Sequence, residues 1–390
     1  MINHLIAQKR RAALAIAAVA LTVLASCGSG IQTAAPSTKI DTSAPVAVAL
    51  LIPKSSAEAG PVATSLENAA RMAVADLGDV KIDLRVYDTA GNADVAAQVA
   101  QQAVDEGAKI ILGPLYAEAA NAAAVAVADD GVNVISFSNN PSIAGGNLFI
   151  LGKTFDNTAR RIVQYAAKQG KKRAVVVLPN NVEGSFGLAA LRSAAFDTGL
   201  QIVSAQGFEF TQQGVVNVVP LVKAAVDIEN ADLVLLTSTS VGALPILAQL
   251  LPEAGVSPEK IQYAGLARWD IPAQTLEFKG LQGGWFAMPD HVRAEQFATR
   301  YQASFGTRPH QLGSLAYDGI NAMGVLMKSA QSNAFSTSSL TQYAGFEGVD
   351  GIFRLKSDGT NERGLAIAQV KDKQVVIIDP APRAFSIGGF

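Results

Sequence analysis

The sequence is poor in the residues that most catalytic and metal sites require. Its 390 residues include one cysteine and three histidines, and only 6% are aromatic. A single cysteine excludes an intrachain disulfide, and it also excludes a zinc centre built from a Cys/His cluster. The spacings G-x-S-x-G, H-E-x-x-H and that of the P-loop are absent as well. We therefore expect a protein that is not an enzyme and that holds neither a metal nor a cofactor.

Charge and long apolar runs are also scarce. Charged residues make up 16% of the chain and the net charge is −2, so the basic surface that binds nucleic acid is not expected. After residue 30, no run reaches the roughly 18 consecutive apolar residues that a membrane helix needs. The length of the chain corresponds to roughly two to three domains. Its hydrophobic fraction of 49% is enough to form their cores.

The first residues have the pattern of an export signal. Lys9, Arg10 and Arg11 precede a short apolar stretch at 12–24, and Leu24-Ala25-Ser26-Cys27 resembles the bacterial lipobox. We predict that residues 1–26 are removed and that Cys27 is acylated, which would anchor the chain to a membrane. Removing three basic residues and no acids from a net charge of −2 leaves −5. The alternative is a signal anchor with an incidental cysteine.

The residues after Cys27 are predicted to form a disordered tether over 27–45, because they are rich in Ser, Thr, Pro and Ala and show no apolar period. The residue after Cys27 is Gly28 rather than an aspartate. In the lipoprotein-sorting pattern this favours the outer membrane, so we expect a lipid-anchored protein of the bacterial envelope that faces the periplasm.

From residue 46 onward, short apolar runs alternate with helical patterns, which predicts an α/β fold with parallel sheets. The first set has strands at 46–52, 81–88, 109–112, 133–138 and 149–151, with helices at 62–77, 93–106 and 117–128. The second set has strands at 173–178, 201–210, 233–239 and 261–266, with helices at 154–169, 185–198, 215–228 and 241–251. The tail has strands at 284–289, 351–355, 365–370 and 374–378, with helices at 294–305 and 312–329.

We expect two Rossmann-like lobes joined by crossover strands, with lobe I at 46–152 and 277–345 and lobe II at 153–276 and 346–390. In open α/β sheets, ligands bind at the carboxyl ends of the strands. The candidate residues for a ligand cleft share this position: Tyr116, Ser136, Ser138, Asn139, Asn180, Thr237, Arg268 and Trp269. The alternative is that they are ordinary loop and capping residues, with Trp269 a packing residue between the lobes.

Several segments, taken in order, resemble the type I periplasmic-binding fold of leucine-binding proteins. They are VAVALLIP, YDTAGNADVAAQVAQQAV, IILGP, VISFSNN, FATRYQASFGTRP, LAYDGINAM and GFEGVDGIFRLKSDG. The resemblance extends from about residue 46 to 379. It implies two lobes around a cleft, and a small amino-acid-like ligand that is passed to an ABC permease.

Within that fold, the lipobox, GPL at 113–115, FAMP at 286–289 and RY…FG…P at 300–309 resemble the penicillin-binding-protein activator lipoproteins. That resemblance implies a non-catalytic outer-membrane protein whose partner is a peptidoglycan synthase. The larger members carry a helical-repeat domain before this fold, whereas only the tether precedes residue 46 here.

The amino-acid branch of the fold implies small hydroxyl residues after the G-x-L turn and after the next strand. The first place has Tyr116 with no adjacent Ser or Thr, and the second has Ser136 and Ser138. Half of that signature is missing. We therefore expect regulation of peptidoglycan synthesis, and keep uptake of an amino acid through an ABC transporter as the alternative.

Overall fold

The computed structural model describes residues 39–385, and its first sheet has five parallel strands in the order β2-β1-β3-β4-β5. These strands are β1 (Val46–Ile52), β2 (Ile82–Asp88), β3 (Ile110–Leu112), β4 (Val134–Ser136) and β5 (Leu148–Ile150). Three helices connect them: α2 (Gly60–Asp76), α3 (Ala93–Asp105) and α4 (Ala117–Ala126). The predicted alternation of the first set is confirmed, with ends that shift by at most two residues.

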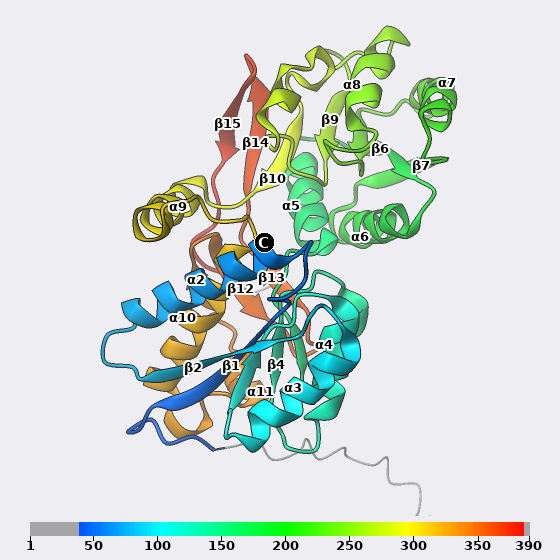
Figure 1. Ribbon diagram of the computed structural model, residues 1–390. Helices are drawn as coiled ribbons and strands as arrows, with labels where there is room; N and C mark the ends of the chain where they lie inside the picture. Colours follow the sequence, from blue (N-terminus) through cyan, green and yellow to red (C-terminus); the bar gives the residue numbers. More distant parts are fainter. Residues whose placement is uncertain (1–38, 386–390) are drawn as a thin grey trace, which may run out of the picture. The chain divides into compact units, whose positions relative to one another are not determined.

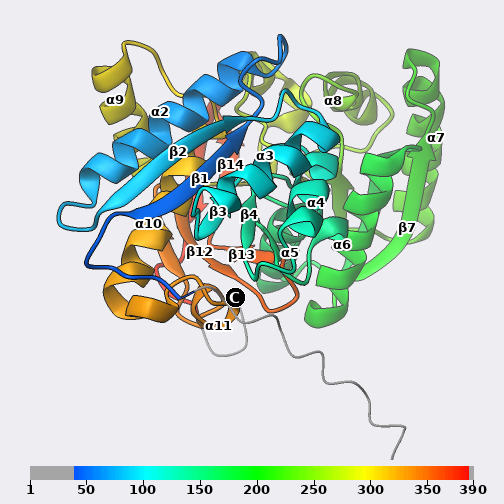
Figure 2. The ribbon, with the colours of Figure 1, turned by 60° about the horizontal axis from the view of Figure 1, so that its bottom comes forward.

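Both faces of this sheet are buried. Along β1, Val48 and Leu50 belong to the core shared with α2 and α10 (Gly313–Ser329), whereas Ala49 and Leu51 belong to the core shared with α3 and α4. Side chains alternate between the faces of a strand, and a parallel sheet covered by helices on both sides therefore needs apolar residues throughout. This explains why the run VAVALLI contains no polar residue (Figures 1 and 2).

The second sheet has seven strands in the order β15-β14-β10-β9-β8-β6-β7. Its strands are β6 (Arg173–Pro179), β7 (Gln201–Phe208), β8 (Leu233–Leu236), β9 (Gln262–Gly265), β10 (Trp285–Met288), β14 (Ala366–Lys371) and β15 (Gln374–Asp379). It is parallel from β7 to β10 and antiparallel at the edge formed by β14 and β15. The chain thus returns at its end to complete the second sheet, as the tail pattern predicted.

Helices cover both faces of the second sheet (Figure 1). One core contains residues of α7 (Gln212–Ile228) and α8 (Leu244–Glu253), and the other contains residues of α5 (Phe155–Lys168) and α6 (Val182–Thr198). Asparagine or threonine caps the α6 and α7 N-termini: Asn181 accepts a hydrogen bond from Gly184 N, and Thr211 accepts one from Gly214 N. These caps satisfy backbone donors that the helix itself leaves free.

A small antiparallel sheet consists of β11 (Phe346–Gly348), β12 (Gly351–Leu355) and β13 (Asn361–Arg363). The sequence patterns did not predict β11 and β13, which have three residues each and lack an apolar run. Two residues of this sheet, Phe346 and Phe353, pack in the core of the first sheet. The sheet is also joined to β5, because Ile150 N donates to Gly359 O at 2.8 Å.

The expected lobe boundaries need correction in two places. The range 277–345 was assigned to lobe I, but β10 pairs with β9 and β14 of the second sheet. The range 346–390 was assigned to lobe II, but Phe346, Phe353 and Leu355 pack with the first sheet. We propose that the chain passes between the lobes at 151–154, 289–290 and 364–365, which we call the three crossovers.

The predicted tether is also too long. Ile40 is buried in the core of the first sheet, and its backbone N–H donates to Ser332 O at 3.0 Å. The tether's last residues are therefore part of the folded body. The predicted signal at 1–26, Cys27 and the tether up to residue 38 lie outside the described residues. Between 39 and 385, no helix is long and apolar enough to cross a membrane.

Gly113 at the carboxyl end of β3 is predicted to be indispensable for stability. It has φ +95°, and a Cβ placed there would lie 2.1 Å from Leu51 O. Gly113→Ala should therefore lower the free energy of unfolding by about 3 kcal/mol or more, because it adds overpacking to an unfavourable φ. Urea denaturation followed by circular dichroism measures this.

Gly199 is the matched control, since it has φ +76° and open space around its Cα. Gly199→Ala should lower the free energy of unfolding by only about 1 kcal/mol. Equal effects of the two substitutions would contradict the role given to the close approach of Leu51.

Candidate functional site

The loop after β4 is held by its own serine hydroxyls. Ser136 Oγ donates to Pro114 O at 2.9 Å and accepts from Ser138 N at 3.0 Å, and Ser138 Oγ accepts from Asn140 N at 3.1 Å. Both serines are buried. These hydroxyls therefore fix the loops after β3 and β4. Ser136, at 0% exposure, is not available to a ligand, which corrects its assignment as a cleft residue.

Tyr116, Asn139 and Asn180 are exposed, as a ligand contact requires. The Tyr116 side chain is 41% exposed at the start of α4. The Asn180 side chain follows β6 and donates from Nδ2 to Glu209 Oε1 at 3.0 Å.

Thr237 and Trp269 do not face a cleft. Thr237 is 3% exposed, and its backbone N–H bonds to Val177 O at 3.1 Å. Trp269 is completely buried in a core of the second sheet, with its ring centroid 6.0 Å from that of Phe286. A Cβ at Gly265 would lie 2.3 Å from Trp269 Nε1, so the indole lies against bare backbone. Both assignments are corrected, and Trp269 is a core residue of the second sheet.

A cavity of about 650 Å³ lies at the carboxyl ends of β4 and β6; we call it the β4–α6 cavity. The loop after β4 borders it, together with the first turn of α5 and the first three turns of α6. Its lining is Asn139, Asn140, Pro141, Phe155, Asp156, Val182, Glu183, Phe186, Ala189, Ala190 and Ser193. The volume lies in the range of small-molecule sites, and a largely apolar lining with a few polar groups is typical of them.

The charged groups of the β4–α6 cavity are both carboxylates. Asp156 lies in the first turn of α5 and Glu183 in the first turn of α6. A helix N-terminus stabilises a negative charge, so these side chains also offset the positive ends of both helices. The cavity thus offers an apolar wall, two amides, one hydroxyl and two acids.

A second cavity, of about 350 Å³, lies beside α9 (His291–Phe305); we call it the α9 cavity. It contains Arg268, the candidate residue after β9, which is paired with Asp270 through Nε and Oδ1 at 2.9 Å. His291 and His310 also line it. The His310 imidazole accepts from Leu312 N through Nδ1 at 3.2 Å, and burial lowers its pKa.

Basic and acidic side chains balance in the α9 cavity. Lys153 pairs with Asp350 at 2.8 Å and Arg308 with Glu295 at 2.6 Å, in addition to the Arg268–Asp270 pair. Its cationic side chains thus already have acidic partners within the wall. Apart from Asn139 in the β4–α6 cavity and Arg268 here, the sequence-based candidates line neither of these cavities.

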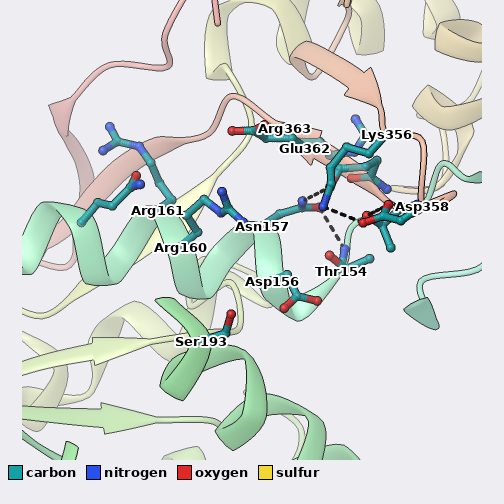
Figure 3. A pocket seen from close by; sticks show the side chains of 13 residues that line it. Thr154, Asp156, Asn157, Arg160, Arg161, Ser193, Lys356, Asp358, Glu362 and Arg363 are labelled. Atoms are coloured by element: carbon teal, nitrogen blue, oxygen red, sulfur yellow. Dashed lines mark hydrogen bonds and ion pairs between the residues drawn. The ribbon is translucent and has the colours of Figure 1, made fainter. Parts of the chain in front are cut away.

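A third cavity, of about 210 Å³, lies between α5 and β13 and is called the α5 cavity. Figure 3 shows Asp156, Asn157, Arg160 and Arg161 along α5, with Lys356, Asp358, Glu362 and Arg363 opposite. Asn157 Oδ1 accepts from Thr154 N at 3.1 Å, and Asn157 Nδ2 donates to Asn361 O at 3.2 Å. The first bond caps the N-terminus of α5, and the second joins α5 to β13 near the first crossover.

Four charged side chains near the crossovers are buried or partly buried, and we call them the crossover cluster: Lys153, Asp318, Asp350 and Arg363. Burial and the neighbouring Asp350 raise the pKa of Asp318 to about 7. Burial pushes the pKa of Asp350 upward, but Lys153 and Ser314 outweigh this and the pKa lies below its usual range. Burial also lowers the pKa of Arg363.

The sequence patterns gave no indication of the crossover cluster, because its members are scattered singly along the chain. Asp318 and Asp350 do lie in the segments LAYDGINAM and GFEGVDGIFRLKSDG. Those segments indicate a resemblance to the type I periplasmic-binding fold, but they do not indicate a buried cluster of charges. Among residues 39–385, no group of three or more His, Cys, Asp or Glu residues is placed to hold a metal ion.

Solved structures of similar fold include solute-binding proteins and transporters by title. A putative branched-chain amino acid ABC transporter from Rhodospirillum rubrum aligns with TM-score 0.74 and 16% identity, over 86% of this chain and 100% of that one. A Desulfitobacterium hafniense ABC transporter substrate-binding protein in complex with Leu aligns with TM-score 0.63 and 16% identity, over 86% and 100%. An R. palustris solute-binding protein in complex with benzoate aligns with TM-score 0.59 and 16% identity, over 89% and 99%.

At these identities the structural likeness shows the fold alone, which is the predicted two-lobe α/β fold. No curated protein matches the sequence significantly. The sequence profile of the family described as "Periplasmic binding protein" matches residues 45–374, which is most of the chain. The chain belongs to the periplasmic binding protein family.

Proposed function

We propose that this protein is a non-catalytic, extracytoplasmic solute receptor of an ABC importer. The observation that carries the proposal is the β4–α6 cavity, which lies at the carboxyl ends of parallel strands, where ligands bind in α/β folds. Membership of the periplasmic binding protein family and the titles of the similar structures support the same function. They favour the uptake alternative over an activator of peptidoglycan synthesis, which none of the titles reported above mentions.

The lining of the cavity indicates the class of solute. The aromatic rings of Phe155 and Phe186 and the side chains of Pro141 and Val182 suit an apolar body. The two acids, Asp156 and Glu183, suit a ligand with hydrogen-bond donors or a positive charge. A ligand carboxylate would face like charges there. We therefore propose an apolar amine or a neutral solute rather than a free amino acid.

The hydroxyls of the first lobe lead to the same conclusion. In the amino-acid branch such hydroxyls hold the charged ends of the ligand, but Ser136 and Ser138 are already bonded to the loop backbone. Turning the Ser136 hydroxyl toward a ligand would break its hydrogen bond to Pro114 O, worth about 1 kcal/mol, and both serines are buried. The similar structures bound to Leu and to benzoate show that this fold accepts different solutes.

Leucine and 3-methylbutylamine form a matched pair of probes, because the amine is leucine without its carboxylate. We expect 3-methylbutylamine to bind more tightly than leucine by about tenfold or more, since it avoids repulsion with Asp156 and Glu183. Isothermal titration calorimetry on the protein measures both affinities. Glu183→Gln should reduce the preference for the amine. Tighter binding of leucine would contradict the proposed solute class while leaving the receptor function standing.

Ala189→Trp tests whether the β4–α6 cavity is the binding site. Ala189 is exposed and lines the cavity, so an indole there should fill the space with little loss of stability. We expect the affinity for the tighter of the two probes to fall about tenfold or more.

The matched control is Ala224→Trp, an equally exposed alanine on α7 that lines none of the three cavities. Unchanged affinity in Ala189→Trp would place the site elsewhere. If neither probe nor isoleucine, valine or benzoate binds, and a peptidoglycan synthase is recovered from envelope extract, the activator function replaces the receptor.

We also propose that the protein is held at a membrane by acylation of Cys27, as the lipobox predicts. Mass spectrometry of the native protein should show cleavage before Cys27 and added acyl chains, and Cys27→Ser should abolish both. A mature protein with a free Cys27 thiol would contradict the anchor. Membrane fractionation then separates the two functions, because a receptor must reach an inner-membrane permease whereas the activator resemblance implies the outer membrane.

A further inference from the structure

Residues of the crossover cluster contact all three crossovers, two through charged side chains and one through the backbone. Lys153, in the first crossover, pairs with Asp350 at 2.8 Å. The backbone of Asp350 accepts from the N–H of Asp290, in the second crossover, at 3.0 Å. Arg363 directly precedes the third crossover, and its guanidinium donates to Leu151 O in the first. A change in lobe angle must therefore strain or break contacts within this cluster.

Asp318 supplies the remaining negative charge from α10. It is 0% exposed, and its Oδ1 accepts from Val349 N at 2.7 Å. Its Oδ2 lies 3.9 Å from Arg363 Nη1 and, among residues 39–385, has no hydrogen-bond partner. A Cβ at Gly348 would lie 2.5 Å from this oxygen, so the carboxyl group lies against the backbone and out of contact with bulk solvent. Such an atom is costly as a bare charge and is less costly with a proton.

We propose that the crossover cluster is a proton-operated clamp: with a proton on Asp318 it holds the lobes in the arrangement seen here, and loss of that proton loosens the crossovers. The proposal concerns the chain itself and needs no solute. It therefore stands or falls separately from the receptor function.

The charges facing Asp318 determine the direction of the effect. They are Asp350, which opposes a second negative charge, and Arg363 and Lys153, which favour one. Of the two cations, Lys153 is bonded directly to Asp350, and Arg363 is not hydrogen-bonded to Asp318 Oδ2. The buried arrangement therefore favours the protonated acid, consistent with a pKa raised from 3.8 to about 7.

The sign of the pH dependence follows from linkage. A state that binds a proton more tightly is favoured by acid. The arrangement with Asp318 buried is favoured most below pH 4. Its advantage declines as the pH rises from 4 to about 7, and its relative population does not change further above that pH. An arrangement in which water reaches Asp318 becomes more populated over the same window, by about tenfold per pH unit at most.

Single-molecule fluorescence energy transfer between the lobes tests the clamp. Cys27 is the chain's one cysteine, so the full chain with Cys27→Ser can be labelled at Ala303→Cys on α9 and Ala224→Cys on α7, both exposed positions. We expect the ratio of the two populations, which differ in transfer efficiency, to change about tenfold or more between pH 5.5 and pH 8, with the arrangement seen here favoured at pH 5.5. In Asp318→Asn, which keeps the acceptor for Val349 but cannot ionise, the shift should be less than about twofold.

Asp76→Asn is the matched control. This carboxylate is also bonded to an arginine in the first lobe, Arg300, at 2.6 Å, but it lies outside the crossovers. The control should keep the pH response of the parent chain. An unchanged transfer distribution in the parent chain between the two pH values, or an equal response in Asp318→Asn, would overturn the proposal.

A direct titration does not depend on the folding of any variant. Carbon-13 NMR of the aspartate carboxyl groups in the unsubstituted chain, with the Asp318 carboxyl resonance assigned through its bonds to the backbone atoms of the same residue, should show that Asp318 titrates near neutral pH. Titration near pH 4 would also overturn the proposal.

Discussion

The structure depends on passing one chain three times between two sheets without leaving buried polar groups unpaired at the junction. The crossovers bring backbone carbonyls and amides inside the molecule, where water does not reach them. Asn361 meets part of this requirement, because its Nδ2 donates to Ile150 O and to Gly152 O at 2.8 Å. Arg363 meets another part of this requirement, because its guanidinium donates to Leu151 O. Once a buried arginine is used for this purpose, nearby acids are needed to balance its charge. Asp350 carries that negative charge, whereas Asp318, whose burial favours the protonated acid, lies beside the arginine without adding a second charge.

The alternation of strands and helices could be read from the sequence because both sheets are mainly parallel and covered on both faces. The run VAVALLI is buried along its whole length and RAVVVLP is buried after its first residue, Arg173, so hydrophobicity alone located them. The strands β11 and β13 could not be found in this way. The β13 residues Asn361, Glu362 and Arg363 are buried but polar, since they serve the junction rather than an apolar core. The same feature misplaced the lobe boundaries, because the crossovers are set by pairing between residues far apart in the sequence.

The strand-end rule placed the candidates at the carboxyl edge of each sheet but did not separate the exposed side chains from the buried ones. Whether a residue after a strand faces outward depends on how the next turn is hydrogen-bonded, and the sequence does not show this. Ser136 turns inward, where its hydroxyl donates to Pro114 O and accepts from Ser138 N. Trp269 turns inward because Gly265 and Gly284 leave room for an indole against the backbone. Asn139, for which no neighbour competes in this way, does reach the β4–α6 cavity.

The side chains that line each cavity determine which ligand can bind there, and the fold alone does not. In the α9 cavity, each cationic side chain is already matched by an acid of the same wall, so a ligand would have to displace a pair to gain a contact. In the β4–α6 cavity, neither Asp156 nor Glu183 is in an ion pair within the described part of the chain, and an apolar wall adjoins both. A ligand gains most where hydrogen-bond acceptors are free and apolar area can be covered together. That condition holds at the β4–α6 cavity, so ligand binding is assigned there even though the α9 cavity is richer in charge.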